Sequence, residues 1–211
     1  MKPVKMLAIM GGPRKQGNSD LLADRLLEAA RAQGAQTRKE YVVDWDIHPI
    51  CDSTACQEED GPCTAPDEAT KLMDLMVAAD VVVFAAPLYW YGPPAQLKAF
   101  IDRWSCRYDD LKKAMKGRRA FLVHTRAEEN PQAAQALVDM TRMATDLLGM
   151  KWAGDLGGVA WKKGEILKNA GALQAAADWG RRLAGAAVRF MSPAGSCRRP
   201  VRVAAWNRPS T

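Results

Sequence analysis

The stretch Val81-Val82-Val83-Phe84-Ala85-Ala86 decides the fold class. It is an unbroken run of β-branched, aromatic and small apolar residues without polar alternation, which is typical of a strand covered by helices on both faces. Working outward from it, other apolar runs of strand length predict four further strands, at Val4–Met10, Thr37–Val43, Ala120–His124 and Trp152–Leu156.

The segments between these runs repeat their apolar residues at helical spacing. After Pro93-Pro94, Leu97 begins an i, i+3, i+4, i+7 series that predicts an amphipathic helix. Asn130-Pro131 predicts a capped helix start and Gly149 the residue just past that helix. Further helices are expected through Leu22, Leu26 and Ala29, through Leu72, Leu75 and Met76, through Leu137, Met140, Ala144 and Leu147, and over Ala170–Phe190.

Strands that alternate with helices predict βαβ units around a parallel sheet, and therefore a three-layer, doubly wound α/β fold. In such sheets ligands bind at the carboxyl ends of the strands, beside the point where the strand order reverses. Binding residues are therefore expected in the loops after the first, third and fourth strands.

Length and composition are those of one globular domain. The chain has 211 residues, of which 48% are hydrophobic and 26% charged, and it contains no apolar run of the roughly 20 residues that span a membrane. The apolar start runs into Gly11-Gly12-Pro13-Arg14 rather than a small-residue cleavage site, so we expect a cytoplasmic protein without a membrane partner.

The net charge of +6 is concentrated at one end. Segment 192–211 holds Arg198, Arg199, Arg202 and Arg208 and no acidic residue, so the rest of the chain is nearly balanced. We expect residues 1–191 to form the domain and 192–211 a basic, disordered tail, because the tail is too polar to bury a core. This distribution argues against a nucleic-acid partner.

The loop after the first strand, Gly11–Ser19, has the composition of an anion site. It is glycine-rich and leads into a helix, with Asn18-Ser19 suited to N-capping, so backbone N–H groups and the helix dipole favour a phosphate. The spacing Gly12-x4-Gly17-Asn18-Ser19 matches the nucleoside-triphosphate loop except for its lysine. Without that cation, a single terminal phosphate is favoured over triphosphate hydrolysis. A loop that merely connects strand and helix is the alternative.

The loop after the third strand, Pro87–Pro94, carries three consecutive aromatic residues, Tyr89, Trp90 and Tyr91. Aromatic side chains at the carboxyl end of a central strand would form a wall for a flat heteroaromatic ring. Packing against the following helix is the alternative role for each of them.

These two motifs, together with Leu97-Lys98-Ala99-Phe100-Ile101-Asp102-Arg103, strongly resemble the NAD(P)H-dependent FMN reductases and multimeric flavodoxin-like oxidoreductases, over residues 4–190. The resemblance implies a flavodoxin-like sheet in the order 2-1-3-4-5, FMN as cofactor and NAD(P)H as co-substrate. It also implies a homodimer or homotetramer. The family commonly has Ser or Thr where this chain has Gly12, so main-chain amides would carry more of the phosphate binding. The residues expected to bind the phosphate are Gly12, Pro13, Arg14, Gly17, Asn18 and Ser19, and those expected to line the isoalloxazine ring are Pro87, Leu88, Tyr89, Trp90 and Tyr91.

The loop after the fourth strand corresponds in position to the third flavin-contacting loop of that family. A cation or donor there, such as Arg126 or Thr125, would stabilise the negative charge of reduced flavin. Alternatively, Arg126 pairs with Glu128 at the surface. His124 is a candidate proton donor to a reduced quinone, although a structural role is the commoner one for a histidine at a strand end.

Cys51, Cys56 and Cys63 lie in the long segment after the second strand, with His48 just before them. Iron–sulfur flavoproteins of the same superfamily have four closely spaced cysteines here, whereas this chain has three at irregular spacing. Free thiols are the favoured interpretation; a zinc site with His48, a cluster completed by Cys106 or an outside ligand, and a redox disulfide are the alternatives. No metal site is predicted.

The expected function is electron transfer from NAD(P)H through flavin N5 to a quinone, free flavin or another small acceptor. The flavin would supply the chemistry, so no catalytic side chain is required. Two alternatives remain open: a flavodoxin-type electron carrier that docks on protein partners, and a flavoprotein that responds to redox state or metal through its cysteine segment. Carriers of the first kind are strongly acidic, which this chain is not.

Overall fold

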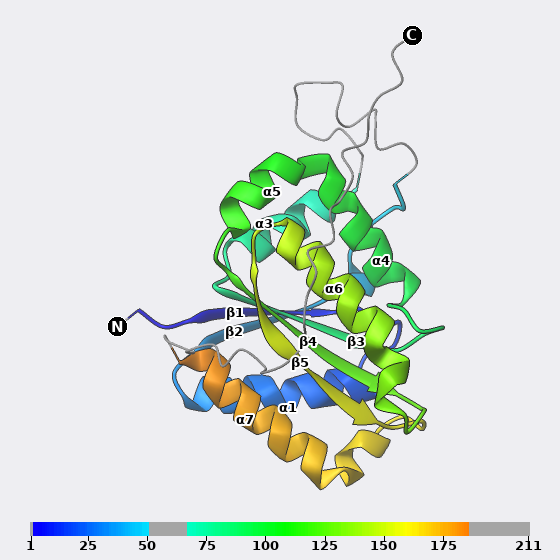
Figure 1. Ribbon diagram of the computed structural model, residues 1–211. Helices are drawn as coiled ribbons and strands as arrows, with labels where there is room; N and C mark the ends of the chain where they lie inside the picture. The colour runs from blue at the N-terminus through cyan, green and yellow to red at the C-terminus, as the bar shows by residue number, and fades with distance from the viewer. Residues whose placement is uncertain (1, 51–66, 186–211) are drawn as a thin grey trace, which may run out of the picture.

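A five-stranded parallel sheet forms the centre of the computed structural model, which describes residues 2–50 and 67–185 (Figure 1). The strand order is β2-β1-β3-β4-β5, as predicted, and every neighbouring pair is parallel. The order reverses between β1 and β3, which places the crevice of a doubly wound sheet beside the loops that follow those two strands. The strands are β1 Lys5–Met10, β2 Gln36–Tyr41, β3 Val81–Pro87, β4 Arg119–Arg126 and β5 Lys151–Val159.

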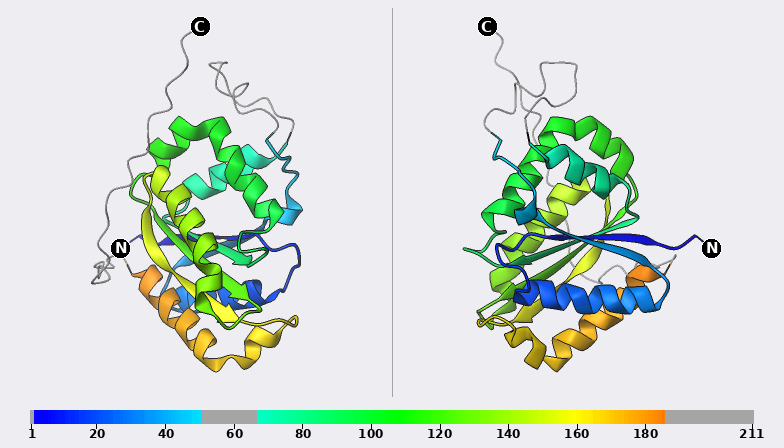
Figure 2. Two further views of the ribbon diagram at one scale, coloured as in Figure 1. Left: turned by 45° about the vertical axis from the view of Figure 1, so that its right-hand side comes forward. Right: turned by 180° about the vertical axis from the view of Figure 1, so that it is seen from behind.

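Helices cover both faces of the sheet and complete the predicted three layers (Figures 1 and 2). One face is covered by α1 (Asn18–Ala32) and α7 (Ala170–Ala184). The opposite face is covered by α3 (Ala69–Val77), α4 (Ala95–Asp102), α5 (Tyr108–Met115) and α6 (Gln135–Leu147). The described part of the chain contains no helix that is long and apolar enough to cross a membrane. Short 3-10 turns lie at η1 Val42–Asp44, η2 Arg103–Arg107, η3 Pro131–Ala134 and η4 Glu165–Lys168.

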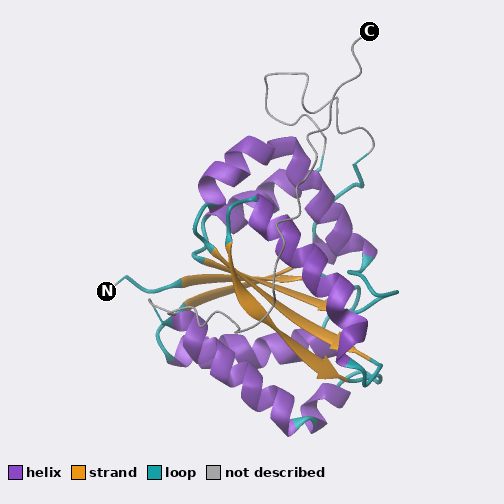
Figure 3. Cartoon of the chain, viewed as in Figure 1, coloured by secondary structure: helices purple, strands orange, loops and turns teal. Residues whose placement is uncertain are grey.

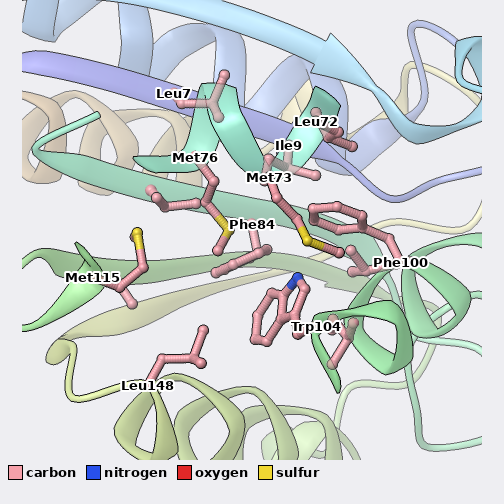
Figure 4. Packing of buried hydrophobic residues seen from close by; sticks show 14 of the residues in the cluster. Leu7, Ile9, Leu72, Met73, Met76, Phe84, Phe100, Trp104, Met115 and Leu148 are labelled. Carbon is pink, nitrogen blue, oxygen red and sulfur yellow. The ribbon is translucent and has the colours of Figure 1, made fainter. Parts of the chain in front are cut away.

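The third strand is buried on both faces, which explains its unbroken apolar sequence. Val81 and Val83 pack in the layer with α1 and α7, whereas Val82 and Phe84 pack in the opposite layer. In that second layer Phe84 and Phe100 flank Trp104, with ring centroids 6.0 Å from Trp104 in each case (Figure 4). Burying an aromatic side chain of this size stabilises the fold by about 1.5–3 kcal/mol.

The two helices on the first face approach each other closely at Gly180. A Cβ atom there would lie 2.1 Å from the backbone oxygen of Leu26 and 3.0 Å from Cβ of Ala29. Only glycine fits at this crossing, so Gly180 fixes how near α7 lies to α1, the helix whose N-terminus borders the phosphate loop.

Several element ends differ from the prediction (Figure 3). The second strand ends at Tyr41, because the chain turns into η1 where the apolar Val42 and Val43 follow. The fourth and fifth strands are longer than their apolar runs, since polar residues at the ends of β4 and mainly glycines at the end of β5 continue the ladder. Helix α5 was not predicted; its charged sequence buries only Leu111 and Met115. Asn130 does accept a hydrogen bond from the amide of Gln132, but it caps η3 rather than α6.

Gly149 lies past α6 with φ of 73°, as predicted from its position. Helix α7 ends at Ala184 rather than Phe190; residues 186–190, like the tail 192–211, lie outside the described residues.

Candidate functional site

The loop that follows β1 is fixed at both ends before it enters α1. The amide of Gly11 donates to the carbonyl of Ala85 at the end of β3, over 2.8 Å. A Cβ at Gly11 would lie 2.6 Å from Leu97 in α4, so glycine is required here. At the other end, the amide of Gln16, whose φ is 58°, donates to Asp20 Oδ2 over 2.6 Å. Contacts within the protein thus fix the shape of the loop at both ends, and its amides adjoin the N-terminus of α1, where an anion is favoured.

The helix start differs from the prediction that Asn18-Ser19 would cap it. Helix α1 begins at Asn18, its N-cap is Gly17, and no side chain caps it. The Asn18 side chain instead reaches the loop after β5, donating to the carbonyl of Lys162 over 2.9 Å. The first amides of α1 therefore have no side-chain acceptor, which leaves them for an anionic ligand.

Asp20 lies in the first turn of α1 and is 3% exposed. Burial raises the pKa of its carboxyl, although the amide of Gln16 and the side chain of Tyr41 act in the opposite direction. Its Oδ1 is buried without a hydrogen-bond partner. Asp20 therefore fixes the loop through its hydrogen bond with the Gln16 amide, and the burial of its carboxylate opposes this contribution.

A cavity of about 510 Å³ opens beside this loop, within the size range of small-molecule and cofactor sites. Its lining includes the basic residues Arg14, Arg126, Lys162 and Lys163, and none of the described residues that line it is acidic. Pro87, Leu88 and Tyr89 form the part contributed by the loop after β3. The remaining lining residues are Gly12, Pro13, Gly17, Asn18, Ser19, Thr125, Ala127, Ala160 and Trp161.

The cavity brings together eleven of the residues predicted to bind cofactor, but not Trp90 and Tyr91. Those two side chains are 97% and 59% exposed, with φ of 48° and 63°. Such positive φ angles are uncommon outside glycine and rare for bulky residues. The conformation is closed by reciprocal backbone hydrogen bonds between Tyr89 and Gly92, and it turns both rings away from the cavity lining.

The close approach of Pro87 explains why position 12 is a glycine. A Cβ at this position would lie 3.2 Å from Cδ of Pro87, closer than most such contacts. The hydroxyl residue that the resembled family has here would therefore press on Pro87, so the phosphate loop of this chain relies on other donors. Ser19 is 5% exposed and lines the cavity.

The loop after β5 supplies four lining residues that sequence reasoning missed, Ala160, Trp161, Lys162 and Lys163, and the loop after β4 supplies a fifth, Ala127. The two adjacent lysines after the fifth strand could have indicated this part of the site. The carboxyl ends of parallel strands lie at one edge of the sheet, so the loop after the fifth strand lies at the same edge as the loops after the others.

His124 does not line this cavity. Its Nε2 lies 3.4 Å from Oδ2 of Asp155 in the neighbouring strand β5. His124 borders a separate cavity of about 790 Å³, which residues of α6 also line. The Arg126 guanidinium also faces this second cavity, which Arg126 and Gly157 both line. It donates a hydrogen bond to the carbonyl of Glu129, not to the Glu128 side chain. Its Nη1 lies 2.8 Å from the position that a Cβ on Gly157 would occupy. Thr125 is buried, 3% exposed, and lines the first cavity.

The candidate metal residues are mostly outside the described chain. Cys51, Cys56 and Cys63 lie in the segment 51–66. His48 places Nε2 3.0 Å from Asp46 Oδ1, and Cys106 accepts from Arg103 Nε over 3.3 Å. Within residues 2–50 and 67–185 no group of three or more His, Cys, Asp or Glu side chains could hold a metal ion.

Comparison with known proteins agrees with this fold. Residues 4–156 match the family model of the NADPH-dependent FMN reductases; the chain belongs to this family of flavin-dependent oxidoreductases, whose cofactor is FMN. A putative NAD(P)H-dependent FMN-containing oxidoreductase of Bacillus subtilis is 29% identical over 82% of this chain and 94% of its own length. An iron–sulfur flavoprotein of Methanocaldococcus jannaschii is 33% identical, over 47% of this chain and 51% of its own.

Solved structures share the fold. The Trp repressor binding protein of Bacillus subtilis superposes with a TM-score of 0.65 at 26% identity, covering 82% of this chain and 99% of that one. An FMN-dependent NADH-azoreductase of Bacillus anthracis, solved in complex with FMN, gives a TM-score of 0.64 at 14% identity, over 86% and 100% of the two chains. At that identity the second likeness concerns the fold alone.

The residues present fit FMN. Main-chain amides at the start of α1 and the basic residues Arg14, Lys162 and Lys163 suit its phosphate, and the Pro87–Tyr89 segment offers an apolar and aromatic surface for its ring.

Proposed function

We propose that this protein is a reductase that takes electrons from NAD(P)H and passes them to a quinone, free flavin or another small acceptor. One observation carries the proposal: a single cavity is lined both by the glycine-rich loop with the start of α1 and by the apolar and aromatic Pro87–Tyr89 segment, with four basic and no acidic residues among its described lining. This is the chemistry of a ligand that joins a phosphate to a flat ring.

FMN, when bound there, supplies hydride acceptance at N5 and onward transfer of electrons. The part of the protein is to bind and orient it. The start of α1, Ser19 and Arg14 hold the phosphate; Pro87, Leu88 and Tyr89 support the ring; and Thr125 borders the ring from β4. Basic residues around the cavity also favour the extra negative charge that a flavin carries once reduced.

The proposal is tested with the purified full chain under anaerobic conditions. NADPH and NADH are added separately and the loss of oxidised-flavin absorbance is followed, and a quinone is then added to restore it. Bleaching by dithionite but by neither nicotinamide would indicate the electron carrier instead. A protein that neither contains FMN nor takes it up would exclude both functions.

Assembly and location are part of the same proposal. Trp90, Tyr91 and Trp161 are large, exposed aromatic residues, 97%, 59% and 76% exposed, in or beside the loops that border the cavity. Exposed apolar residues gathered at one place are typical of an interface, which supports a homodimer or homotetramer. Sedimentation of the full chain gives the expected mass of two or four copies, and a monomer at all concentrations would contradict it. We also propose that the protein works in the cytoplasm.

A further inference from the structure

The segment after β5, residues 160–165, which ends at the first residue of η4, lies against the start of α1 although it is distant from it in sequence. Its first residue is fixed to β4, because the amide of Ala160 donates to the carbonyl of Arg126 over 2.8 Å. Its far end is fixed by Ile166, which is fully buried and packs so closely on Gly158 that a Cβ there would lie 2.5 Å from Ile166 Cδ1. Both ends of the loop are therefore held.

Asn18 joins this loop to the start of α1. Its Nδ2 donates to the carbonyl of Lys162 over 2.9 Å, and its Oδ1 accepts from the amide of Ile166 over 3.4 Å. Both ends of one amide side chain are thus used on the loop. Because Asn18 is the first residue of α1, the main chain of Lys162 lies directly beside the helix N-terminus that forms the anion site.

The loop also has an internal support. Glu165 Oε2 accepts from the amides of Trp161 and Lys162, over 2.6 Å and 2.9 Å. These backbone hydrogen bonds lower the pKa of the Glu165 carboxyl, so it stays ionised and keeps accepting them near neutral pH. Gly164, with φ of 80°, makes the turn between them. Contacts within the protein thus support the conformation of the segment that carries the two lysines.

We propose that residues 160–165 are a fourth cofactor-binding segment, held in place by Asn18, and that Lys162 and Lys163 bind the phosphate of FMN. This rests on the function proposed above. The two lysines are exposed and line the same cavity as Gly12 and Ser19, where their charges complement a dianionic phosphate. They make up for the hydroxyl that Gly12 lacks.

Asn18 then has a role different from the one that the family resemblance implies. Its Oδ1 and one of the two N–H groups of Nδ2 are engaged with Ile166 and Lys162, which leaves a single N–H of this side chain for any other acceptor. It is a positioning residue: it acts on the cofactor through the loop that it holds. A direct ligand and a positioning residue predict different couplings between Asn18 and the lysines.

The lysines are tested by comparing FMN with riboflavin, which has the same ring but no phosphate. The dissociation constants of both are measured with apo-protein by flavin fluorescence, for wild type, Lys162→Ala and Lys163→Ala. Each substitution is expected to weaken FMN binding about tenfold, the effect of one charge-assisted hydrogen bond, and to leave riboflavin binding unchanged. Lys168→Ala is the matched control: Lys168 is exposed in η4 and outside the cavity lining, so it should change neither constant.

Asn18 is tested by a double-mutant cycle and by proteolysis. In the wild-type background Asn18→Ala should weaken FMN binding about as much as loss of one lysine, about tenfold. In the Lys162→Ala/Lys163→Ala background it should have little further effect. Trypsin cleavage after Lys162 and Lys163 in apo-protein should be faster in Asn18→Ala than in wild type, with circular dichroism used to confirm that the variant is folded.

The possible outcomes distinguish a failure of this inference from a failure of the proposed function on which it rests. If wild type binds neither flavin, the proposed function itself fails. If it binds FMN and the two lysine variants bind FMN and riboflavin as wild type does, only the role of the lysines is refuted. If Asn18→Ala weakens FMN binding equally in both backgrounds, Asn18 acts independently of the lysines, as a direct phosphate ligand would, and its positioning role is refuted. An unchanged cleavage rate in Asn18→Ala would also refute the positioning role.

Discussion

Replacing Arg103 with methionine tests how the protein holds the segment between β2 and α3. Arg103 is paired with Asp67, and the two side chains are 3% and 1% exposed. The guanidinium also donates to the carbonyl of His48 over 3.3 Å, while Asp67 accepts from the amides of His48 and Ala69 over 3.1 Å and 3.2 Å. One buried pair thus joins the residues just before and just after the segment that carries Cys51, Cys56 and Cys63.

The magnitude follows from the burial of the carboxylate. Arg103→Met leaves Asp67 with two amide donors and no counter-charge, and removing one partner of a buried pair costs about 3–5 kcal/mol. A domain of this size loses about 2–4 °C of melting temperature per kcal/mol, so a decrease of about 6–20 °C is expected. Arg118→Met is the control: its pair with Asp80 is 37% and 40% exposed, and such pairs contribute about 0–1 kcal/mol.

The effect should also depend on pH. Burial opposes ionisation of Asp67, but the Arg103 guanidinium and the two amides outweigh it and lower the pKa of the carboxyl. A carboxyl whose pKa is lower in the folded state stabilises the fold above its unfolded pKa of about 4, and this stability is lost as the pH falls through the folded value. The difference in free energy of unfolding between wild type and Arg103→Met should therefore become smaller at acid pH.

The assay is urea and thermal unfolding at neutral and acid pH, for wild type, Arg103→Met, Asp67→Asn and the double variant. The double variant should lose less than the sum of the two single losses. A loss below about 1 kcal/mol for Arg103→Met, or strictly additive losses, would refute the reasoning that this pair is buried and coupled.

Three further predictions concern the phosphate loop and its helix. Ser19→Ala should weaken FMN binding about tenfold, the effect of one hydrogen bond to a charged group, and unaltered affinity by fluorescence titration would count against Ser19 as a ligand. Gly180→Ala should lower the melting temperature markedly, since its Cβ would stand 2.1 Å from the Leu26 oxygen and overpacking costs about 1–3 kcal/mol or more; an unchanged melting temperature would show that the helices can separate freely. Because burial raises the pKa of the Asp20 carboxyl, the free energy of unfolding of wild type should decrease as the pH rises from the ordinary pKa of an aspartate to the raised pKa in the fold. Asp20→Asn should remove this pH dependence, as measured by urea unfolding at a series of pH values.

The three layers could be predicted from the residues because the central strands contain unbroken apolar runs, whereas the strand order was implied by the family resemblance. The Val81–Ala86 run has no polar residue, and both of its faces are buried. The parts that were missed depend on tertiary neighbours. Helix α5 buries too few residues to show a clear apolar period, and the end of β2 is set by a 3-10 turn that its apolar residues do not reveal.

The site was predictable where one short segment carries the chemistry, as in the Gly11–Ser19 loop. It was not predictable where it depends on pairing between distant segments. The contact between Asn18 and Lys162 joins residues 144 positions apart, so neither local sequence nor the resemblance indicated that Lys162 and Lys163 line the cavity. Composition alone also could not show that the chain after Tyr89 turns Trp90 and Tyr91 outward.

The most direct test of the central claim is a crystal structure of the full chain with FMN bound. The phosphate is expected at the start of α1 between Ser19 and the lysine loop 160–165, and the ring against Pro87, Leu88 and Tyr89. FMN bound in the cavity under α6 beside His124 and Asp155, or absent from crystals grown at saturating FMN, would contradict the account.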